Sequence, residues 1–149
     1  VAPMVESIWT EVEPLATRKK LLFRLDGEAA VLADGQGLEQ VLKNLIDNAV
    51  RYTPEGGFIE VEIRDEPLQA RISVRDDGIG IPSSALDRVF ERFYRVDPAR
   101  SRAEGGTGLG LAIVRHLVHA MGGDVWAESE LGQGTTMTFT LPRPEGKEE

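Results

Sequence analysis

Hydrophobic residues between positions 38 and 52 recur every three to four residues, which predicts a helix buried on one face. Charged residues of alternating sign fall four apart on a second, solvated face. Between these faces lies a polar stripe made of Gln40, Asn44, Asn48 and Arg51. Asparagine is a poor helix former, and a buried amide costs free energy unless a partner satisfies it. The stripe is therefore either a set of surface amides or a ligand site, and this helix alone leaves both interpretations open.

The same kinds of pattern divide the rest of the chain into helices and strands. Apolar spacing predicts an opening helix over 4–16, interrupted near Pro14, and a strongly apolar helix over 112–121. Strict alternation over 59–63 and 70–74 predicts two strands with one polar face, which favours a sheet covered by helices on its other face. The remaining predicted elements are a short helix over 84–96 and strands at 21–25, 30–32, 125–127 and 137–141.

Local signals mark where two of these helices begin and end. Asp34 is expected to cap the N-terminus of the helix with the polar stripe, and Thr53-Pro54 is expected to end it. Gly122-Gly123 should end the helix over 112–121. The chain is polar from Pro142 onward and is expected to fray there.

Composition narrows the class of protein. The chain of 149 residues suits one domain with a real core, and its 41% hydrophobic and 28% charged residues are ordinary for a soluble globule. It has no apolar run of about 20 residues, so no membrane span is expected, and no signal peptide is expected at its start. The absence of cysteine excludes disulfides and thiolate metal sites and fits a reducing compartment. Two histidines without a His-Glu cluster argue against a zinc enzyme.

Charge is unevenly spread along the chain. A net charge of −8 argues against nucleic acid as the main partner, because phosphate backbones need a basic face. Residues 88–102 nevertheless hold five arginines against Glu91 and Asp97, so five minus two leaves a local charge of +3. This segment is either a loop that handles anions or a solvated helix face. Its arginines are Arg88, Arg92, Arg95, Arg100 and Arg102.

Two glycine-rich segments are candidates for contact with a ligand. The run from Asp76 to Pro82 closes the second alternating strand, and is either an ordinary Asp-Gly turn or a place where backbone approaches a flat ligand beside a carboxylate. Glycines over 106–110 precede the helix over 112–121 and form either a flexible turn or an anion site of free N–H groups. Their spacing matches neither a P-loop nor a Rossmann fingerprint. The aperiodic residues 97–107 predict a mobile lid.

These segments together resemble the catalytic ATP-binding domain of two-component sensor histidine kinases. Each motif alone is a weak signal, but five in the family's order are specific, and the resemblance extends over residues 11–142. The motifs are an N box at Gln40–Thr53, a G1 box at Asp77–Pro82, an F box at Val89–Arg95, a G2 box at Gly106–Leu111 and a G3 turn at Gly132–Thr135.

The resemblance implies an α+β fold of the GHKL superfamily, the Bergerat fold, which is shared with gyrase B and the DNA-mismatch-repair ATPases. This is a two-layer α/β sandwich in which about three helices cover one face of a mixed, mostly antiparallel sheet. ATP would lie between the helices and a lid at about residues 91–108. The expected organisation is a single, monomeric domain over 1–142 with a polar tail over 143–149.

The resemblance also implies roles for residues. Asn48 would hold Mg²⁺, with Asn44 close to the metal and the phosphates; a neutral oxygen ligand suits Mg²⁺ because phosphates and waters fill most of its octahedron. Arg51 stands where the family usually has lysine, and would meet phosphate through a fork instead of a point charge. Tyr52 would line the nucleotide, and Asp77 would accept a hydrogen bond from the adenine amino group.

Further residues complete the site that the resemblance implies. Arg95, with Arg92, would reach the terminal phosphates, and Asn44 and Arg95 would be the catalytic residues. Thr135 would help Asp77 at the adenine, partly through water. The other implied nucleotide-binding residues are Gly78, Gly80, Ile81, Gly106, Thr107, Gly108, Leu109, Gly110 and Leu111.

The implied function is transfer of the γ-phosphate of Mg-ATP to a histidine on a separate dimerisation domain, with a response regulator acting indirectly downstream. The family's acceptor segment does not occur in this sequence, and His116 and His119 are expected to be surface or packing residues. ATPases of the wider superfamily carry glutamate where Asn44 stands, and an amide cannot act as that base, so hydrolysis should be slow. The alternatives are a serine kinase of the anti-sigma-factor type and a nucleotide-binding switch. A cytoplasmic location is expected, with membrane anchoring of a longer parent left open.

Overall fold

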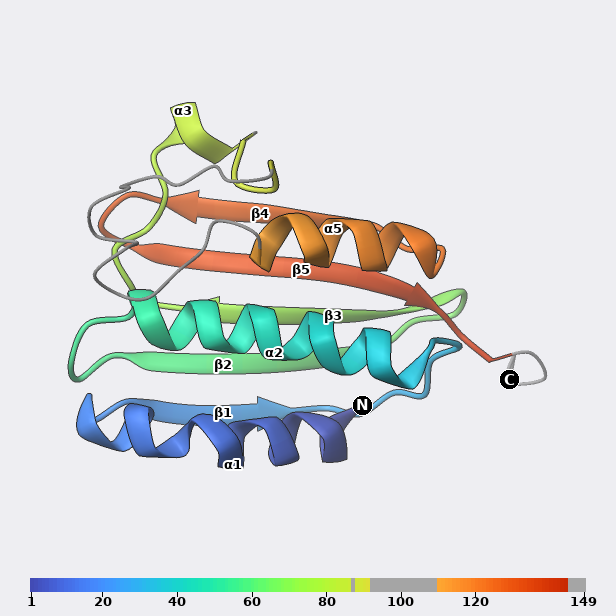
Figure 1. Cartoon of the computed structure of the whole chain (residues 1–149), viewed down its shortest axis with the longest axis horizontal. Helices are drawn as coiled ribbons and strands as arrows, with labels where there is room; N and C mark the ends of the chain where they lie inside the picture. The colour runs from blue at the N-terminus through green and yellow to red at the C-terminus, as the bar shows by residue number, and fades with distance from the viewer. Residues whose placement is uncertain (87, 92–109, 145–149) are drawn as a thin grey trace.

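A five-stranded sheet forms one layer of the protein (Figure 1). The computed structural model describes residues 1–86, 88–91 and 110–144. The strands lie in the order β1-β2-β3-β5-β4, and β1 pairs with β2 in parallel whereas the other three pairs are antiparallel. The prediction of a mixed, mostly antiparallel sheet is therefore confirmed. The strands are β1 (Leu22–Asp26), β2 (Phe58–Asp65), β3 (Gln69–Asp76), β4 (Val125–Glu130) and β5 (Gly134–Pro142).

Three long helices lie side by side across one face of this sheet (Figure 1). The central helix, α2, packs between the other two and has the polar stripe. Across the described ranges, no helix is both long and apolar enough to cross a membrane. The helices are α1 (Ala2–Arg18), α2 (Gly35–Tyr52), the short α3 (Ser83–Leu86) and α5 (Gly110–Ala120).

The core lies between the helices and the sheet. Alternate residues of β2 and β3 point into it, as the sequence pattern predicts, and α2 meets them with its apolar face. Leu42 and Leu45 of α2 and Phe139 of β5 are among the largest fully buried side chains. At roughly 1.5–3 kcal/mol for each such side chain, this burial fixes how α2 is rotated on the sheet.

The helix ends follow the sequence signals. The Asp34 side chain accepts a hydrogen bond from the Gly37 N–H at 2.7 Å and so caps α2, which ends at Tyr52 just before Thr53-Pro54. The predicted break near Pro14 is wrong, because α1 continues to Arg18 and buries Ala16 after the proline.

Two other predicted elements differ from the structure. Residues 30–32 form no strand. The Leu32 N–H donates to the Pro142 carbonyl at the end of β5, but the segment forms no ladder and leads the chain from the end of β1 to the start of α2. The helix predicted over 84–96 is helical only at Ser83–Leu86, and residues 88–90 form a turn. Residues 87 and 92–96 lie outside the described part of the chain.

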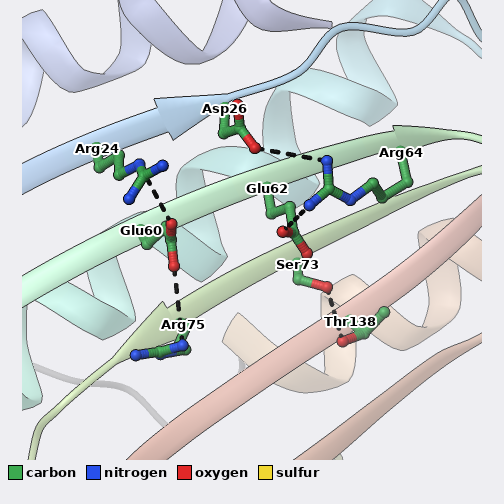
Figure 2. A network of polar contacts seen from close by, with 8 residues as sticks. All are labelled: Arg24, Asp26, Glu60, Glu62, Arg64, Ser73, Arg75 and Thr138. Carbon is green, nitrogen blue, oxygen red and sulfur yellow. Dashed lines mark hydrogen bonds and ion pairs between the residues drawn. The ribbon is translucent and has the colours of Figure 1, made fainter.

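The face of the sheet away from the helices carries ion pairs that cross from strand to strand (Figure 2). Glu60 of β2 lies between two arginines, with Arg24 of β1 at 3.5 Å and Arg75 of β3 at 3.9 Å. Its side chain is only 20% exposed, so it is screened less than a free surface carboxylate. Glu60 thus neutralises two cations that would otherwise repel one another.

A second set of contacts continues along the same face. Arg64 of β2 pairs with Asp26 of β1 at 3.4 Å and also with Glu62 of its own strand. The hydroxyls of Ser73 and Thr138, which are partners across β3 and β5, lie 3.1 Å apart (Figure 2). This face is therefore organised by polar contacts, whereas the opposite face forms the core.

We expect Glu60→Gln to lower the free energy of unfolding by about 0.5–1 kcal/mol, because the change leaves Arg24 and Arg75 unneutralised. Urea denaturation at low salt measures the loss, and it should shrink in about 1 M salt, where screening acts within a few ångströms. Glu128→Gln on the same face is the matched control, since Glu128 is exposed and has no ion pair among the described residues. Equal losses in the two variants would contradict a network at Glu60.

Candidate functional site

The polar stripe of α2 is not sealed in apolar packing, because Gln40 is exposed and Asn44, Asn48 and Arg51 are half-buried. The Asn44 amide nitrogen donates to the Gly110 carbonyl at 3.2 Å, and Gln40 donates to the Asn44 side-chain oxygen at 3.1 Å. Asn44 thereby joins the middle of α2 to the first turn of α5. The Gly110 and Leu111 positions at that turn are also half-buried.

Asn48 lies one turn further along the stripe. Its side chain is half-buried and makes no hydrogen bond within the part of the chain that the structure describes. The amide therefore has its oxygen available to a ligand without losing a protein contact. Neutral oxygen donors of this kind suit Mg²⁺, so the residues present fit the metal that the resemblance implies.

The last turn of α2 is held by two basic side chains. Lys19, just beyond α1, donates to the Val50 carbonyl at 2.8 Å and to the Arg51 carbonyl at 3.1 Å, so it satisfies carbonyls that a helix end leaves without partners. Arg51 itself pairs with Asp47 at 2.7 Å. Sequence reasoning missed Lys19, because no local pattern shows that it meets α2 more than 30 residues later.

Three polar residues form a row across the end of the sheet on its helix-covered face. Asp76 of β3 is the register partner of Thr135 of β5, and Thr135 is the partner of Ser129 of β4. Asp76 follows the buried Val74 by two residues, so the pleat points both toward the helices. We call Asp76, Thr135 and Ser129 the strand-end row.

Asp77, the first residue of the predicted G1 box, and the preceding Asp76 point to different places. Asp76 is half-buried and accepts a hydrogen bond from the Gly78 N–H at 2.8 Å. Asp77 is exposed, and its carboxylate accepts from the Phe58 N–H at 2.8 Å, at the start of β2. The carboxylate in the strand-end row is therefore Asp76, whereas sequence reasoning selected Asp77. The alternation over 70–74, continued by two residues, indicates this orientation of Asp76, and the role of Asp77 stays a prediction.

Burial raises the pKa of the Asp76 carboxyl to about 6, from an ordinary value of 3.8. The N–H groups of Gly78 and Thr135 lower this pKa, whereas the neighbouring negative charge of Asp77 raises it further. The burial outweighs the two hydrogen bonds, so the fold keeps a carboxylate where it is costly to ionise. Perturbed acids of this kind are enriched at functional sites.

Close backbone contacts fix the turn after β3. A side chain at Gly78 would come within 2.5 Å of the Tyr52 carbonyl, which places the end of α2 directly against this turn. Gly80 has a φ of +78°, and a side chain there would come within 2.4 Å of the Glu130 carbonyl. The turn is thus held between α2 and the connection from β4 to β5, and the stripe of α2 leads to the strand-end row.

The structure brings together one part of the predicted site and leaves another part untested. The stripe of α2, the turn after β3, Thr135 and the start of α5 all lie in the described residues. The lid expected at about 91–108 falls almost entirely outside them, so the roles assigned there stay predictions. The site residues outside the described part are Arg92, Arg95, Gly106, Thr107, Gly108 and Leu109.

Comparison with known proteins decides the family. Residues 33–145 match the family model described as "Histidine kinase-, DNA gyrase B-, and HSP90-like ATPase". The chain belongs to this ATPase family. The sensor histidine kinase WalK of Bacillus subtilis is 51% identical to this ATPase domain over 126 residues, which cover 83% of the chain and 21% of WalK. The chain thus spans about a fifth of the length of that curated relative.

Solved structures give the same assignment. The catalytic domain of histidine kinase ThkA superposes with a TM-score of 0.83 at 27% identity, over 96% of this chain and 92% of that one. Full-length ShkA in complex with AMPPNP gives a TM-score of 0.81 at 34% identity, over 94% of this chain and 29% of ShkA. A ThkA structure in complex with response regulator protein TrrA also matches, with a TM-score of 0.79 at 25% identity over 99% of this chain and 41% of that one. The chain is a histidine-kinase-type ATP-binding catalytic domain, and the predicted family and fold are confirmed.

We expect Asp76→Asn to stabilise the ligand-free domain at neutral pH. Between about pH 4 and pH 6 the folded chain holds more protons on Asp76 than the unfolded chain, so wild-type stability falls as the pH rises through that window. Asparagine keeps an acceptor for Gly78 and avoids the buried charge, so its advantage should develop across the same window. Above pH 6 it should reach about 1–2 kcal/mol, less than the full shift implies because the carboxyl is partly exposed.

Thermal denaturation of both proteins from pH 3.5 to 8 measures this difference. Asp77→Asn is the matched control, because Asp77 is exposed and asparagine keeps the acceptor for Phe58. A larger gain in stability for Asp77→Asn than for Asp76→Asn at neutral pH would show that Asp77, and not Asp76, is the carboxylate that is costly to ionise.

Proposed function

We propose that this domain binds Mg-ATP and passes the γ-phosphate to a histidine on a separate dimerisation domain of a sensor histidine kinase. The observation that carries the proposal is the polar stripe of α2, in which Asn44, Asn48 and Arg51 are half-buried. Asn44 contacts Gly110 of α5, and the end of the same helix, at Tyr52, lies against the turn after β3. The site therefore has the amide oxygens of α2 near α5, and the strand-end row of the sheet near the end of α2. A nucleotide with its phosphates beside α5 and its base beside β3 fits that division.

At the base end, we assign the adenine amino group to Asp76 and not to Asp77. Asp76 faces the layer between sheet and helices, beside Thr135, whereas the exposed Asp77 carboxylate already accepts from the backbone of β2. A carboxylate accepts hydrogen bonds only, so it suits an exocyclic amino group. Tyr52, Gly78, Gly80 and Ile81 would then surround the base.

At the phosphate end, Asn48 would bind Mg²⁺ with Asn44 next to it, and Arg51 would meet phosphate. The metal would neutralise phosphate charge, which is the main requirement of phosphoryl transfer. The protein groups hold the geometry: Lys19 fixes the last turn of α2 and Asn44 fixes the distance from α2 to α5. Since Asn44 is a neutral amide and cannot take a proton from water, ATP would be retained for transfer.

The partners follow from the relatives. The TrrA complex of ThkA supports a response regulator as the downstream partner, and the net charge of −8 speaks against nucleic acid. A serine kinase or a simple nucleotide switch is not favoured, because the relatives compared are named sensor histidine kinases. The monomeric state and the cytoplasmic location stay predictions.

We expect Asn48→Ala to remove most of the tightening of ATP binding that Mg²⁺ produces, a loss of about tenfold in affinity or 1.4 kcal/mol. Titration of a fluorescent ATP analogue with Mg²⁺ and with EDTA measures it. Glu39→Ala is the control, because Glu39 lies on the exposed face of the same helix. An unchanged response to Mg²⁺ in Asn48→Ala would refute the metal role.

The reaction itself is tested by transfer of labelled phosphate. The domain is mixed with the histidine-bearing helical hairpin of a sensor kinase and ATP labelled at the γ-phosphate. Label should appear on the hairpin, and should not appear when the hairpin histidine is replaced by glutamine or when Asp76→Asn is used. ATP binding without transfer to any hairpin would favour the nucleotide switch instead.

A further inference from the structure

Three polar groups lie within hydrogen-bond distance of the single hydroxyl group of Ser129. Its Oγ is 2.7 Å from the Ile81 N–H, 2.8 Å from the Gly134 carbonyl oxygen and 2.9 Å from the Thr135 Oγ1. Ile81 belongs to the turn after β3, and Gly134 and Thr135 begin β5. Ser129 therefore connects the turn beside the base site to the strand-end row.

Counting protons assigns a direction to each of these hydrogen bonds. The Ile81 N–H can only donate, and the Gly134 carbonyl can only accept, so the single Ser129 proton goes to Gly134. Two oxygens at 2.8 Å without a proton between them would repel each other. Ser129 then has no proton for Thr135, and the Thr135 hydroxyl must donate to Ser129. The lone pairs of Thr135 are what remain for a ligand.

We propose that Ser129 is a positioning residue that sets the base preference of this site by making Thr135 a hydrogen-bond acceptor. The inference rests on the proposed function, because it concerns the base of the bound nucleotide. Thr135 and Asp76 are direct neighbours in the strand-end row, so the site presents two acceptors side by side. Two acceptors favour a purine with a 6-amino group, as in adenine, and disfavour one with a 6-oxo group, as in hypoxanthine.

Loss of the Ser129 hydroxyl changes this arrangement at one atom. In Ser129→Ala, the Thr135 hydroxyl has lost its acceptor and can turn its proton toward the ligand. A 6-oxo purine then gains a donor, whereas a 6-amino purine keeps the Thr135 oxygen as an acceptor. The preference for ATP over ITP, which is the hypoxanthine nucleotide, should therefore fall by about five- to tenfold, the effect of one hydrogen bond gained by ITP.

The experiment measures the dissociation constants of ATP and ITP for the wild type, Ser129→Ala and Ser129→Thr. Ser129→Thr restores the hydroxyl and should restore the wild-type ratio of the two constants. Ser73→Ala is the matched control, because Ser73 also contacts a threonine hydroxyl across two strands but on the opposite face of the sheet (Figure 2). The ratio of the ATP and ITP dissociation constants in Ser73→Ala should equal that of the wild type.

The outcomes separate the inference from the proposed function. A lowered ratio in Ser129→Ala with recovery in Ser129→Thr supports the positioning role. Equal weakening of ATP and ITP would mean that Ser129 only ties the turn to β5, which overturns the inference and leaves the proposed function standing. A wild type that binds neither nucleotide would overturn the proposed function. Should Ser129→Ala fail to fold, the ratio in Ser129→Cys, whose thiol is a weak acceptor, decides between the same two results.

Discussion

The packing of α2 against the sheet is the constraint on which the rest of the site depends. Eight residues of this helix are buried, and its polar stripe lies beside that apolar face. Because interiors are packed as densely as organic crystals, the helix cannot rotate without opening voids. The hydrophobic contacts of the buried face of α2 therefore hold the amides at the surface of the core, although the amides take no part in those contacts. The contacts of Lys19, Gly110 and the turn after β3 then fix the position of the helix along its axis.

Periodicity alone was enough to predict α2, α5 and the alternating strands, because their side-chain pattern repeats over several turns or pleats. It was not enough for residues 30–32, since three apolar residues carry no information about whether a neighbouring strand exists. The family resemblance implies Asp77 as the adenine acceptor, whereas the pleat of β3 directs the neighbouring Asp76 toward the helix-covered face. Lys19 and Ser129 could not be predicted locally, since the first acts through the end of α2 and the second connects residues 48 apart in sequence.

The two faces of the sheet meet different demands. On one face, the strand-end row places a carboxylate where ionisation is costly, which lowers the stability of the ligand-free fold. Such a cost is common at functional sites and is tolerated while the whole domain stays above its stability threshold. On the other face, cross-strand ion pairs and hydroxyl contacts hold the same strands together without any buried charge of that kind.

The ion pairs of Arg24 and Asp26 have a further consequence for how copies of this protein behave toward one another. Both residues belong to β1, which is the outermost strand of the sheet and only five residues long. A long, flat, apolar outermost strand would offer its backbone to any extended segment that met it, including a copy of itself. A short strand with charges at alternate positions is a poor template for such growth. The ion pairs that join β1 to β2 therefore also oppose aggregation at this edge of the sheet.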